Sequence, residues 1–156
     1  MTQLVPPVSS VAPDFTLDST SGAAVTLSSY RGQQPVLLAF FPLAFTSVCT
    51  AELCSFTDNF DKFREHNVAV LPVSVDSVPT LKEYKAKHDM KTELLSDFKR
   101  EVGKLYGVLL LDKFYDNRAY FLVDKEGVIR WEHVEERPSM RRDDEEILAQ
   151  IAKLAK

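Results

Sequence analysis

Residues 36–54 read VLLAFFPLAFTSVCTAELC, and their character changes halfway along. The first six residues, Val36 to Phe41, are all apolar, which predicts a strand buried on both faces in the middle of a sheet. Pro42 ends this run, and a helix is expected to begin near Ser47. Cys49 would then lie in the first turn of that helix, just beyond the carboxyl end of a central strand. Open α/β sheets place their active sites at this edge.

The rest of the chain alternates between strand patterns and helix patterns. Strands are expected at residues 15–17, 25–27 and 68–75, and a hairpin at 120–123 and 128–134 around Lys125-Glu126-Gly127. Pro72 weakens the prediction of the third strand. Helices are expected at residues 47–66, 81–88, 102–106 and 147–154. This order predicts an α/β fold, with a central mixed β-sheet flanked by helices, in a single domain over residues 1–156.

The first expected helix has an apolar face and the last has an acidic start. Helical spacing places these residues of the first helix on one inward face: Cys49, Leu53, Phe56, Phe60 and Phe63. Asn67 is a plausible stop after it. Asp143 and Asp144 suit the N-terminus of the last helix, where the helix dipole favours negative charge.

Bulk properties bound the partners and the compartment. The net charge is −4, which argues against nucleic acid and anionic membranes as main partners. No segment reaches the roughly 20 apolar residues that a membrane span needs. Residues 1–13 hold no Lys or Arg and no long apolar run, so no secretory signal is expected and the cytoplasm is the expected compartment. The two cysteines are not needed as structural staples, which favours a redox or catalytic use.

The position of Cys49 favours its reactive form. A thiol reacts as the thiolate, and unpaired N–H groups and the helix dipole at a helix start stabilise that anion. Thr46 can direct its hydroxyl at the sulfur or at a substrate oxygen, and it can also serve as a helix N-cap. Pro42 can shield the thiolate from water, or simply end the strand. By itself, a free cysteine is more often a small buried apolar residue.

The segment Phe40 to Glu52, FFPLAFTSVCTAE, resembles the active-site signature of the peroxiredoxins, above all of their alkyl hydroperoxide reductase E (AhpE) branch. Further segments are similar to family segments in the same order: Ala12–Phe15, Val73–Ser77, Leu94–Asp97, Tyr106–Val108 and Arg118–Asp124. The resemblance implies a thioredoxin-like fold and a peroxidatic cysteine at Cys49. It also implies that Thr46 and Pro42 shape the pocket.

The same resemblance assigns two charged residues to the site. Arg118 matches an arginine beside the sulfur, where a fixed guanidinium would stabilise the thiolate and polarise the O–O bond. Glu52 matches a residue that holds this arginine. Without the resemblance, Arg118 would be a surface charge and Glu52 a solvated helix residue. The chain departs from the family at Glu93, where many members have a proline before a strand.

Cys54 adds a feature of a second branch. The order Cys-Thr-x-Glu-x-Cys at residues 49–54 resembles the bacterioferritin-comigratory (PrxQ-type) peroxiredoxins. Five residues on a helix span about 7.5 Å of rise, which exceeds the reach of a disulfide between the Cα atoms. An intramolecular disulfide between Cys49 and Cys54 therefore requires the helix start to unwind. The alternative is a passive Cys54, with an external thiol that resolves the sulfenic acid.

These observations predict a thiol-dependent peroxidase that reduces hydrogen peroxide or small alkyl hydroperoxides and is recycled by thioredoxin or a similar dithiol. No metal, haem, flavin or other cofactor is expected, because the three histidines are scattered and no Gly-rich phosphate loop is present. A general disulfide oxidoreductase is disfavoured, since Cys-x-x-Cys is absent. A redox sensor or binding protein that uses Cys49 only as a switch stays open. The AhpE resemblance suggests a homodimer, whereas the PrxQ-type branch is often monomeric.

Overall fold

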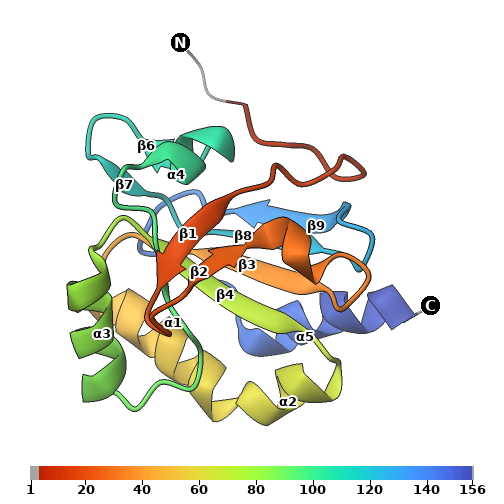
Figure 1. Cartoon of the computed structure of the whole chain (residues 1–156), viewed down its shortest axis with the longest axis horizontal. Helices are drawn as coiled ribbons and strands as arrows, with labels where there is room; N and C mark the ends of the chain where they lie inside the picture. The colour runs from red at the N-terminus through yellow and green to blue at the C-terminus, as the bar shows by residue number, and fades with distance from the viewer. Residues whose placement is uncertain (1–3, 156) are drawn as a thin grey trace.

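The computed structural model describes residues 4–155, which form a mixed sheet with helices on both sides (Figure 1). The seven-stranded sheet has the order β2-β1-β5-β4-β3-β8-β9. Its strands are β1 (Thr16–Ser19), β2 (Ala24–Thr26), β3 (Val36–Phe40), β4 (Ala69–Ser74), β5 (Leu95–Ser96), β8 (Ala119–Val123) and β9 (Ile129–Val134). A separate two-stranded sheet pairs β6 (Leu109–Leu110) with β7 (Tyr115–Asp116).

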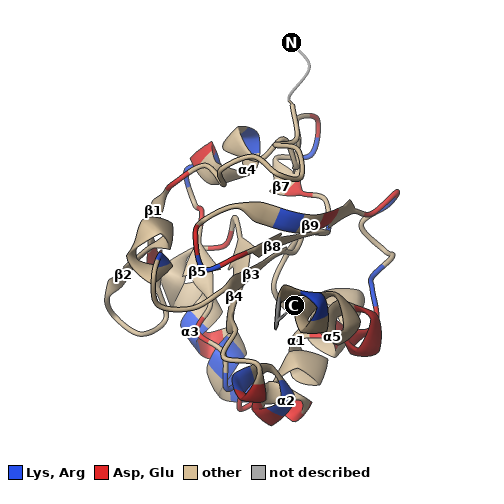
Figure 2. Cartoon of the chain, turned by 90° about the vertical axis from the view of Figure 1, so that its right-hand side faces the viewer, with Lys and Arg blue, Asp and Glu red and all other residues tan. Residues whose placement is uncertain are grey.

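The helices divide between the two faces of this sheet. They are α1 (Ser47–Asp58), α2 (Phe60–Glu65), α3 (Val78–Lys87), α4 (Glu101–Leu105) and α5 (Asp144–Ala152), with short 3-10 helices at Leu27–Tyr30 and Lys153–Ala155. Figures 1 and 2 both show α1, α2 and α5 on one side of the sheet, with α4 and the β6–β7 hairpin on the other.

The central strand β3 contributes to a separate core on each face. Val36, Leu38 and Phe40 pack with residues from α4 and the N-terminal segment, while Leu37 and Ala39 pack against α1, α2 and α5. All five side chains are 1% exposed or less. β3 pairs parallel with β4 and antiparallel with β8, so it lies inside the sheet. The predicted buried central strand and the predicted mixed sheet are therefore confirmed.

The helix predicted over residues 47–66 is two helices, and that part of the prediction is wrong. α1 ends at Asp58, and Asn59 leaves the helical conformation, with φ −99° and ψ 13°. The side-chain amide of Asn59 donates to Asp144, far along the chain, at 2.8 Å. This break turns α2 away from the α1 axis, so Phe60 is only half-buried while Phe56 and Phe63 remain in the core.

The strand that contains Pro72 forms as predicted, despite the missing N–H group. The carbonyl of Val73 accepts from Phe41 on the β3 side, so the nitrogen of Pro72 faces the opposite side, towards β5. Within β4, the ladder to β5 includes Val73 and Ser74, and Pro72 lies just outside it. Glu93, the departure from the family pattern, is held by Lys85 at 2.8 Å and Thr20 at 2.5 Å.

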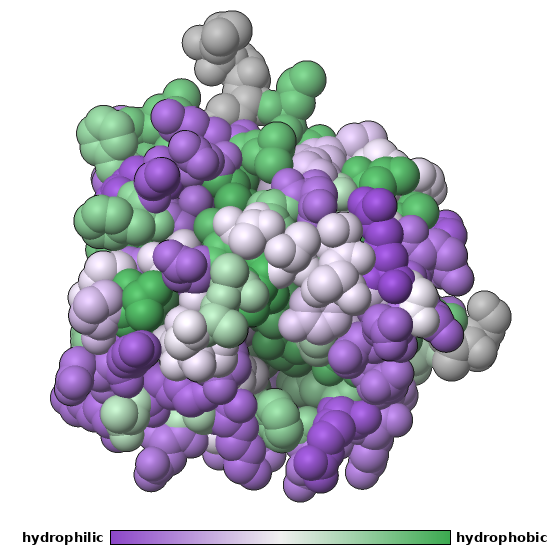
Figure 3. All heavy atoms as spheres, in the orientation of Figure 1, coloured by the Kyte–Doolittle hydropathy of each residue, from purple (hydrophilic) through white to green (hydrophobic). Residues whose placement is uncertain are grey.

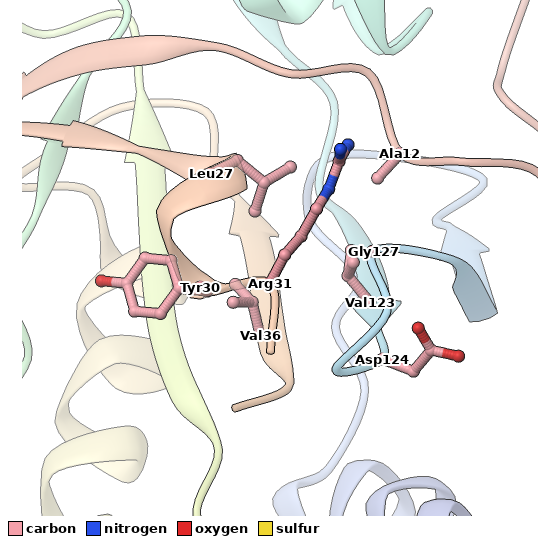
Figure 4. A pocket seen from close by; sticks show the side chains of 8 residues that line it. All are labelled: Ala12, Leu27, Tyr30, Arg31, Val36, Val123, Asp124 and Gly127. Carbon is pink, nitrogen blue, oxygen red and sulfur yellow. The ribbon is translucent and has the colours of Figure 1, made fainter. Parts of the chain in front are cut away.

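Charge marks no single interaction face on the described part of the chain. In the ribbon of Figure 2, positively and negatively charged residues are interspersed along α2 and α3. A hollow of about 410 Å³ has Val25, Tyr30 and Phe63 in its lining. The face in Figure 3 is hollowed near its centre, with hydrophilic residues along the lower edge. A smaller pocket has a volume of about 10 Å³. Figure 4 shows the side chains that line it, with Arg31 passing beside Gly127. Neither hollow is lined by a cysteine. None of the helices within residues 4–155 is long and apolar enough to cross a membrane.

Asp116, at the end of β7 in the two-stranded sheet, is a buried acid. Its side chain is 0% exposed, and neither carboxylate oxygen has a hydrogen-bond partner among the described residues. Burial, reinforced by the neighbouring Asp97 carboxylate, raises the pKa of Asp116 to about 8. Folding therefore favours the protonated form of this group, and its ionisation opposes the folded state.

We expect Asp116→Asn to remove part of the pH dependence of stability. Because the folded-state pKa lies above the ordinary value of 3.8, the contribution of Asp116 is complete at low pH and is lost as pH rises towards about 8. The loss is up to about 1.4 kcal/mol per pH unit in this window. Thermal unfolding of both proteins from pH 5 to pH 9 should show the variant gaining on the wild type until about pH 8. The exposed Asp112→Asn serves as control, and equal pH profiles for all three proteins would contradict the assignment.

Candidate active site

Cys49 lies buried in the first turn of α1, behind the loop that leaves β3. Its side chain is 1% exposed and packs in an apolar cluster with Leu53 of the same helix and with Phe41, Leu81 and Tyr84. The Sγ atom accepts from Nη2 of Arg118 at 3.1 Å. The structure thus brings the predicted thiol to a helix start and places a cation directly against it.

The loop before α1 is held by hydrogen bonds of its own. The N–H group of Ala44 donates to Asp76 at 2.8 Å, and Phe45 takes a left-handed conformation with φ 66°. Thr46 occupies the N-cap position of α1, but its hydroxyl donates to the carbonyl of Leu43 at 2.7 Å and does not cap the helix. In this geometry the Thr46 hydroxyl is not directed at the sulfur, although its oxygen can still accept a hydrogen bond.

Arg118 is fixed by three acceptors at once. It immediately precedes β8, is 1% exposed, and donates through Nη1 to Glu52 at 2.9 Å as well as through Nη2 to Cys49. The carbonyl of Pro138 accepts from both Nε, at 3.3 Å, and Nη2, at 3.0 Å. Burial opposes the charge of this guanidinium, but Glu52 and Cys49 together raise the pKa of Arg118 above its ordinary value. The site therefore holds a permanent cation whose orientation is set by geometry.

Glu52 pairs with Arg118 from inside α1, with 2.9 Å between Oε1 and Nη1. Its side chain is 0% exposed, and burial raises the pKa of Glu52 even though Arg118 and Tyr120 favour the carboxylate. The second carboxylate oxygen accepts from the hydroxyl of Tyr120, which itself accepts from the N–H group of Arg142 at 3.0 Å. The resulting chain runs from Cys49 through Arg118 and Glu52 to Tyr120.

Sequence reasoning missed two members of this site. Pro138 contributes a backbone carbonyl, which no side-chain pattern can indicate. Tyr120 did carry a signal, because it is the one hydroxyl in the buried run AYFLV of β8 and a buried tyrosine hydroxyl needs a partner. The sequence did not tell which partner that would be.

A pocket of about 220 Å³ opens beside the thiol. Its lining combines Cys49, Arg118, Pro42 and Thr46 with apolar and small residues, namely Leu43, Ser47, Val48, Tyr115, Pro138 and Ser139. Four of the six predicted site residues thus line one pocket, whereas Glu52 and Cys54 are not part of its lining. Phe45 is not part of the lining, since its ring packs on Tyr84 with centroids 4.8 Å apart. In the described residues, no three His, Cys, Asp or Glu side chains converge as a metal site.

Cys54 does not meet Cys49 in this structure. Both cysteines are free thiols, and both lie in one unbroken helix, α1. Cys54 is half-buried, and burial together with Asp58 raises the pKa of the Cys54 thiol. The five-residue separation on an intact helix keeps the two Cα atoms beyond disulfide reach.

Comparison with known proteins gives a consistent family. Residues 8–132 match the model of the AhpC/TSA family. The chain is 39% identical over 136 residues to alkyl hydroperoxide reductase E of Mycobacterium tuberculosis, which covers 86% of this chain and 89% of that protein. It is 37% identical over 124 residues to the chloroplastic peroxiredoxin Q of Oryza sativa subsp. japonica, covering 78% of this chain and 56% of the relative.

The fold agrees with the sequence match. A crystal structure of the reduced 2-Cys peroxiredoxin of Plasmodium vivax superposes with a TM-score of 0.88 at 33% identity, over 95% of this chain and 81% of the other. The AhpC protein of Enterococcus faecalis has a TM-score of 0.87 at 23% identity, over 94% and 90% of the two chains. The expected thioredoxin-like fold is therefore confirmed. A buried thiol against a fixed guanidinium, in a chain related in sequence and fold to these proteins, identifies a member of the AhpC/TSA family, a peroxidase of the peroxiredoxin type.

Proposed function

We propose that Cys49 reduces hydrogen peroxide or small alkyl hydroperoxides through a thiolate mechanism. The observation that carries the proposal is the 3.1 Å contact between Cys49 Sγ and Arg118 Nη2 beside an open pocket. The thiolate attacks one oxygen of the peroxide, the O–O bond breaks, and the other oxygen leaves with its electron pair and takes a proton as water or an alcohol. Cys49 becomes a sulfenic acid. The apolar side chains of Leu43 and Val48 suit a small alkyl group.

Arg118 has two roles in this step. It stabilises the thiolate before attack, and it stabilises the negative charge that builds on the leaving oxygen as the O–O bond breaks. Glu52 positions Arg118 so that one guanidinium nitrogen faces the sulfur. Pro42 and Thr46 shape the entry of the pocket, and the oxygen of Thr46 can accept a hydrogen bond from the peroxide.

Resolution by Cys54 is the second part of the proposal. The first turns of α1 unwind, the Cys54 thiol attacks the sulfenic sulfur, an S–S bond forms and water leaves. A thioredoxin-like dithiol then reduces the disulfide, and such a reductant implies a reducing compartment such as the cytoplasm. The competing possibility is a one-Cys cycle in which an external thiol resolves Cys49. A sensor that only switches at Cys49 would not turn over peroxide.

We also propose a homodimer that uses the exposed aromatic side chains near α4. The side chains of Phe98 and Phe114 are 61% and 63% exposed, which is unusual for two aromatic residues. Arg100 fixes both segments, because it donates to the carbonyl of Phe98 at 2.6 Å and to that of Phe114 at 2.7 Å. Two exposed aromatic side chains on segments that one arginine joins favour self-association. Sedimentation should show a dimer that Phe98→Ser with Phe114→Ser converts to a monomer; an unchanged mass would refute this interface.

Arg118→Met should slow the first step strongly. The variant keeps the side-chain volume but removes the cation at the sulfur, and loss of such a preorganised donor costs about 100-fold or more in rate. The second-order rate constant for Cys49 oxidation by hydrogen peroxide, from stopped-flow measurements, reports this loss. Arg118→Lys should recover part of it, because the charge returns without the two-pronged geometry. The matched control is Arg130→Met on β9, where Arg130 pairs with Asp124 at the surface; activity as low as in Arg118→Met would overturn the assignment.

Cys54→Ser separates the two resolution schemes. After one equivalent of peroxide, the wild type should lose two hydrogens within one chain by mass spectrometry. The variant should instead carry a sulfenic acid on Cys49 and should lose steady-state turnover with thioredoxin. Cys49→Ser should lose the oxidation altogether. Wild-type protein with an oxidised Cys49 and a free Cys54 would support the one-Cys cycle and exclude the disulfide.

A further inference from the structure

The start of α1 has little local stabilisation. The hydroxyl of its N-cap residue, Thr46, is occupied by the carbonyl of Leu43 and does not cap the helix. The first turn also contains no acidic residue that would complement the helix dipole. A helix start without a side-chain N-cap and without an acidic residue in its first turn depends on tertiary contacts for its stability.

The other end of α1 is anchored. Ser55 and Asn59 both donate side-chain hydrogen bonds of 2.8 Å to the same oxygen of Asp144 at the start of α5. Phe56 is 0% exposed in the core between α1, α5 and the sheet. An opening of α1 that spares these contacts is confined to the residues before Ser55, which include both cysteines.

Glu52 is a buried, charged contact of that segment with the rest of the fold. It lies between Cys49 and Cys54, and its two carboxylate oxygens are bound by Arg118 and by Tyr120. Unwinding the segment must withdraw this carboxylate from its buried site. Arg118 also donates to the thiol, whereas the hydroxyl of Tyr120 donates to Glu52.

Tyr120 is itself rigidly placed. It stands on β8, is 0% exposed, and stacks on Trp131, with ring centroids 6.1 Å apart and 30° between the planes. Its oxygen accepts from the N–H group of Arg142, and the Arg142 side chain is paired with the buried Glu135 at 2.9 Å. The hydroxyl hydrogen is therefore directed at Glu52.

We infer that Tyr120 is a positioning residue that holds residues 47–54 of α1 closed through Glu52, and thereby sets how readily this segment opens. Removal of the Tyr120 hydroxyl leaves one carboxylate oxygen of Glu52 buried and unpaired, which raises the free energy of the closed state. The free energy of the open state does not change, because water solvates Glu52 there. Opening should then be about tenfold more frequent. The link from this opening to disulfide formation rests on the proposed role of Cys54.

Hydrogen exchange of the reduced, full-length protein tests the inference without requiring Cys54 chemistry. Amides of residues 47–54 should exchange about tenfold faster in Tyr120→Phe than in the wild type, while amides of β3 and β8 stay protected. Tyr106→Phe is the matched control, because this equally buried tyrosine donates to Pro13 at 2.6 Å and lies in the core that includes α4. Unchanged exchange in residues 47–54, or an equal increase throughout the chain, would overturn the inference. If Tyr120→Phe does not fold, Glu52→Gln should accelerate exchange in the same segment. Unchanged exchange there, or an equal increase throughout the chain, would again overturn the inference.

A second measurement follows the oxidised protein. After a peroxide pulse, the Tyr120→Phe protein should form the Cys49–Cys54 disulfide about tenfold faster and should accumulate less sulfinic Cys49 at high peroxide, as measured by mass spectrometry after acid quenching. A merely destabilising substitution, such as Tyr106→Phe, should not shift this partition. If the wild type forms no disulfide, the resolving role of Cys54 fails, while the exchange rates still decide the role of Tyr120. If the wild type forms the disulfide and Tyr120→Phe does so at the same rate, the inference fails alone.

Discussion

The guanidinium of Arg118 is the contact on which the rest of this site depends. A buried arginine is unfavourable unless its charge and its N–H groups are satisfied. Here the carboxylate of Glu52, the sulfur of Cys49 and the carbonyl of Pro138 satisfy it from two separate parts of the chain. α1 and the segment after β9 are thereby fixed around one cation. The thiol lies against this cation because the same contacts that make the arginine tolerable also orient it.

The sheet explains why two residues 69 positions apart can meet. β3 and β8 are antiparallel neighbours, and Phe40 at the end of β3 pairs with Ala119 at the start of β8. The chain that leaves β3 towards Cys49 and the chain that enters β8 from Arg118 therefore occupy the same edge of the sheet. Both strands are wholly buried, so their register is tied to the packing of two cores. The position of the cation is thus set by elements that do not need to move, while the sulfur lies on the start of α1.

The parts of this structure that could be predicted are those with local causes. The apolar run of β3, the helix start after Pro42 and the β8–β9 hairpin follow from residues that are neighbours in sequence. The end of α1 at Asn59 could not be predicted, because it involves Asp144, 85 positions away. β5, β6 and β7 have two residues each, which is too short for any periodicity. Arg118 could be assigned only through the resemblance of the chain to the peroxiredoxins, because the residues next to it in sequence do not distinguish it from a surface charge. The partner of Tyr120 needed the fold itself.

The arrangement around Glu52 has a physical consequence for the proposed cycle. The contacts that keep Arg118 against the thiol also keep the first turns of α1 in place, since one carboxylate serves both purposes. Stronger hydrogen bonds from Arg118 and Tyr120 to Glu52 favour attack on peroxide and disfavour any later movement of Cys54 towards Cys49. Weaker hydrogen bonds have the opposite effect. The two requirements are reconciled if the closed segment is only moderately more stable than the open one, which the uncapped start of α1 favours. The anchor of Ser55 and Asn59 on Asp144 then limits the opening to the residues that chemistry requires, and the remainder of the helix stays in the core.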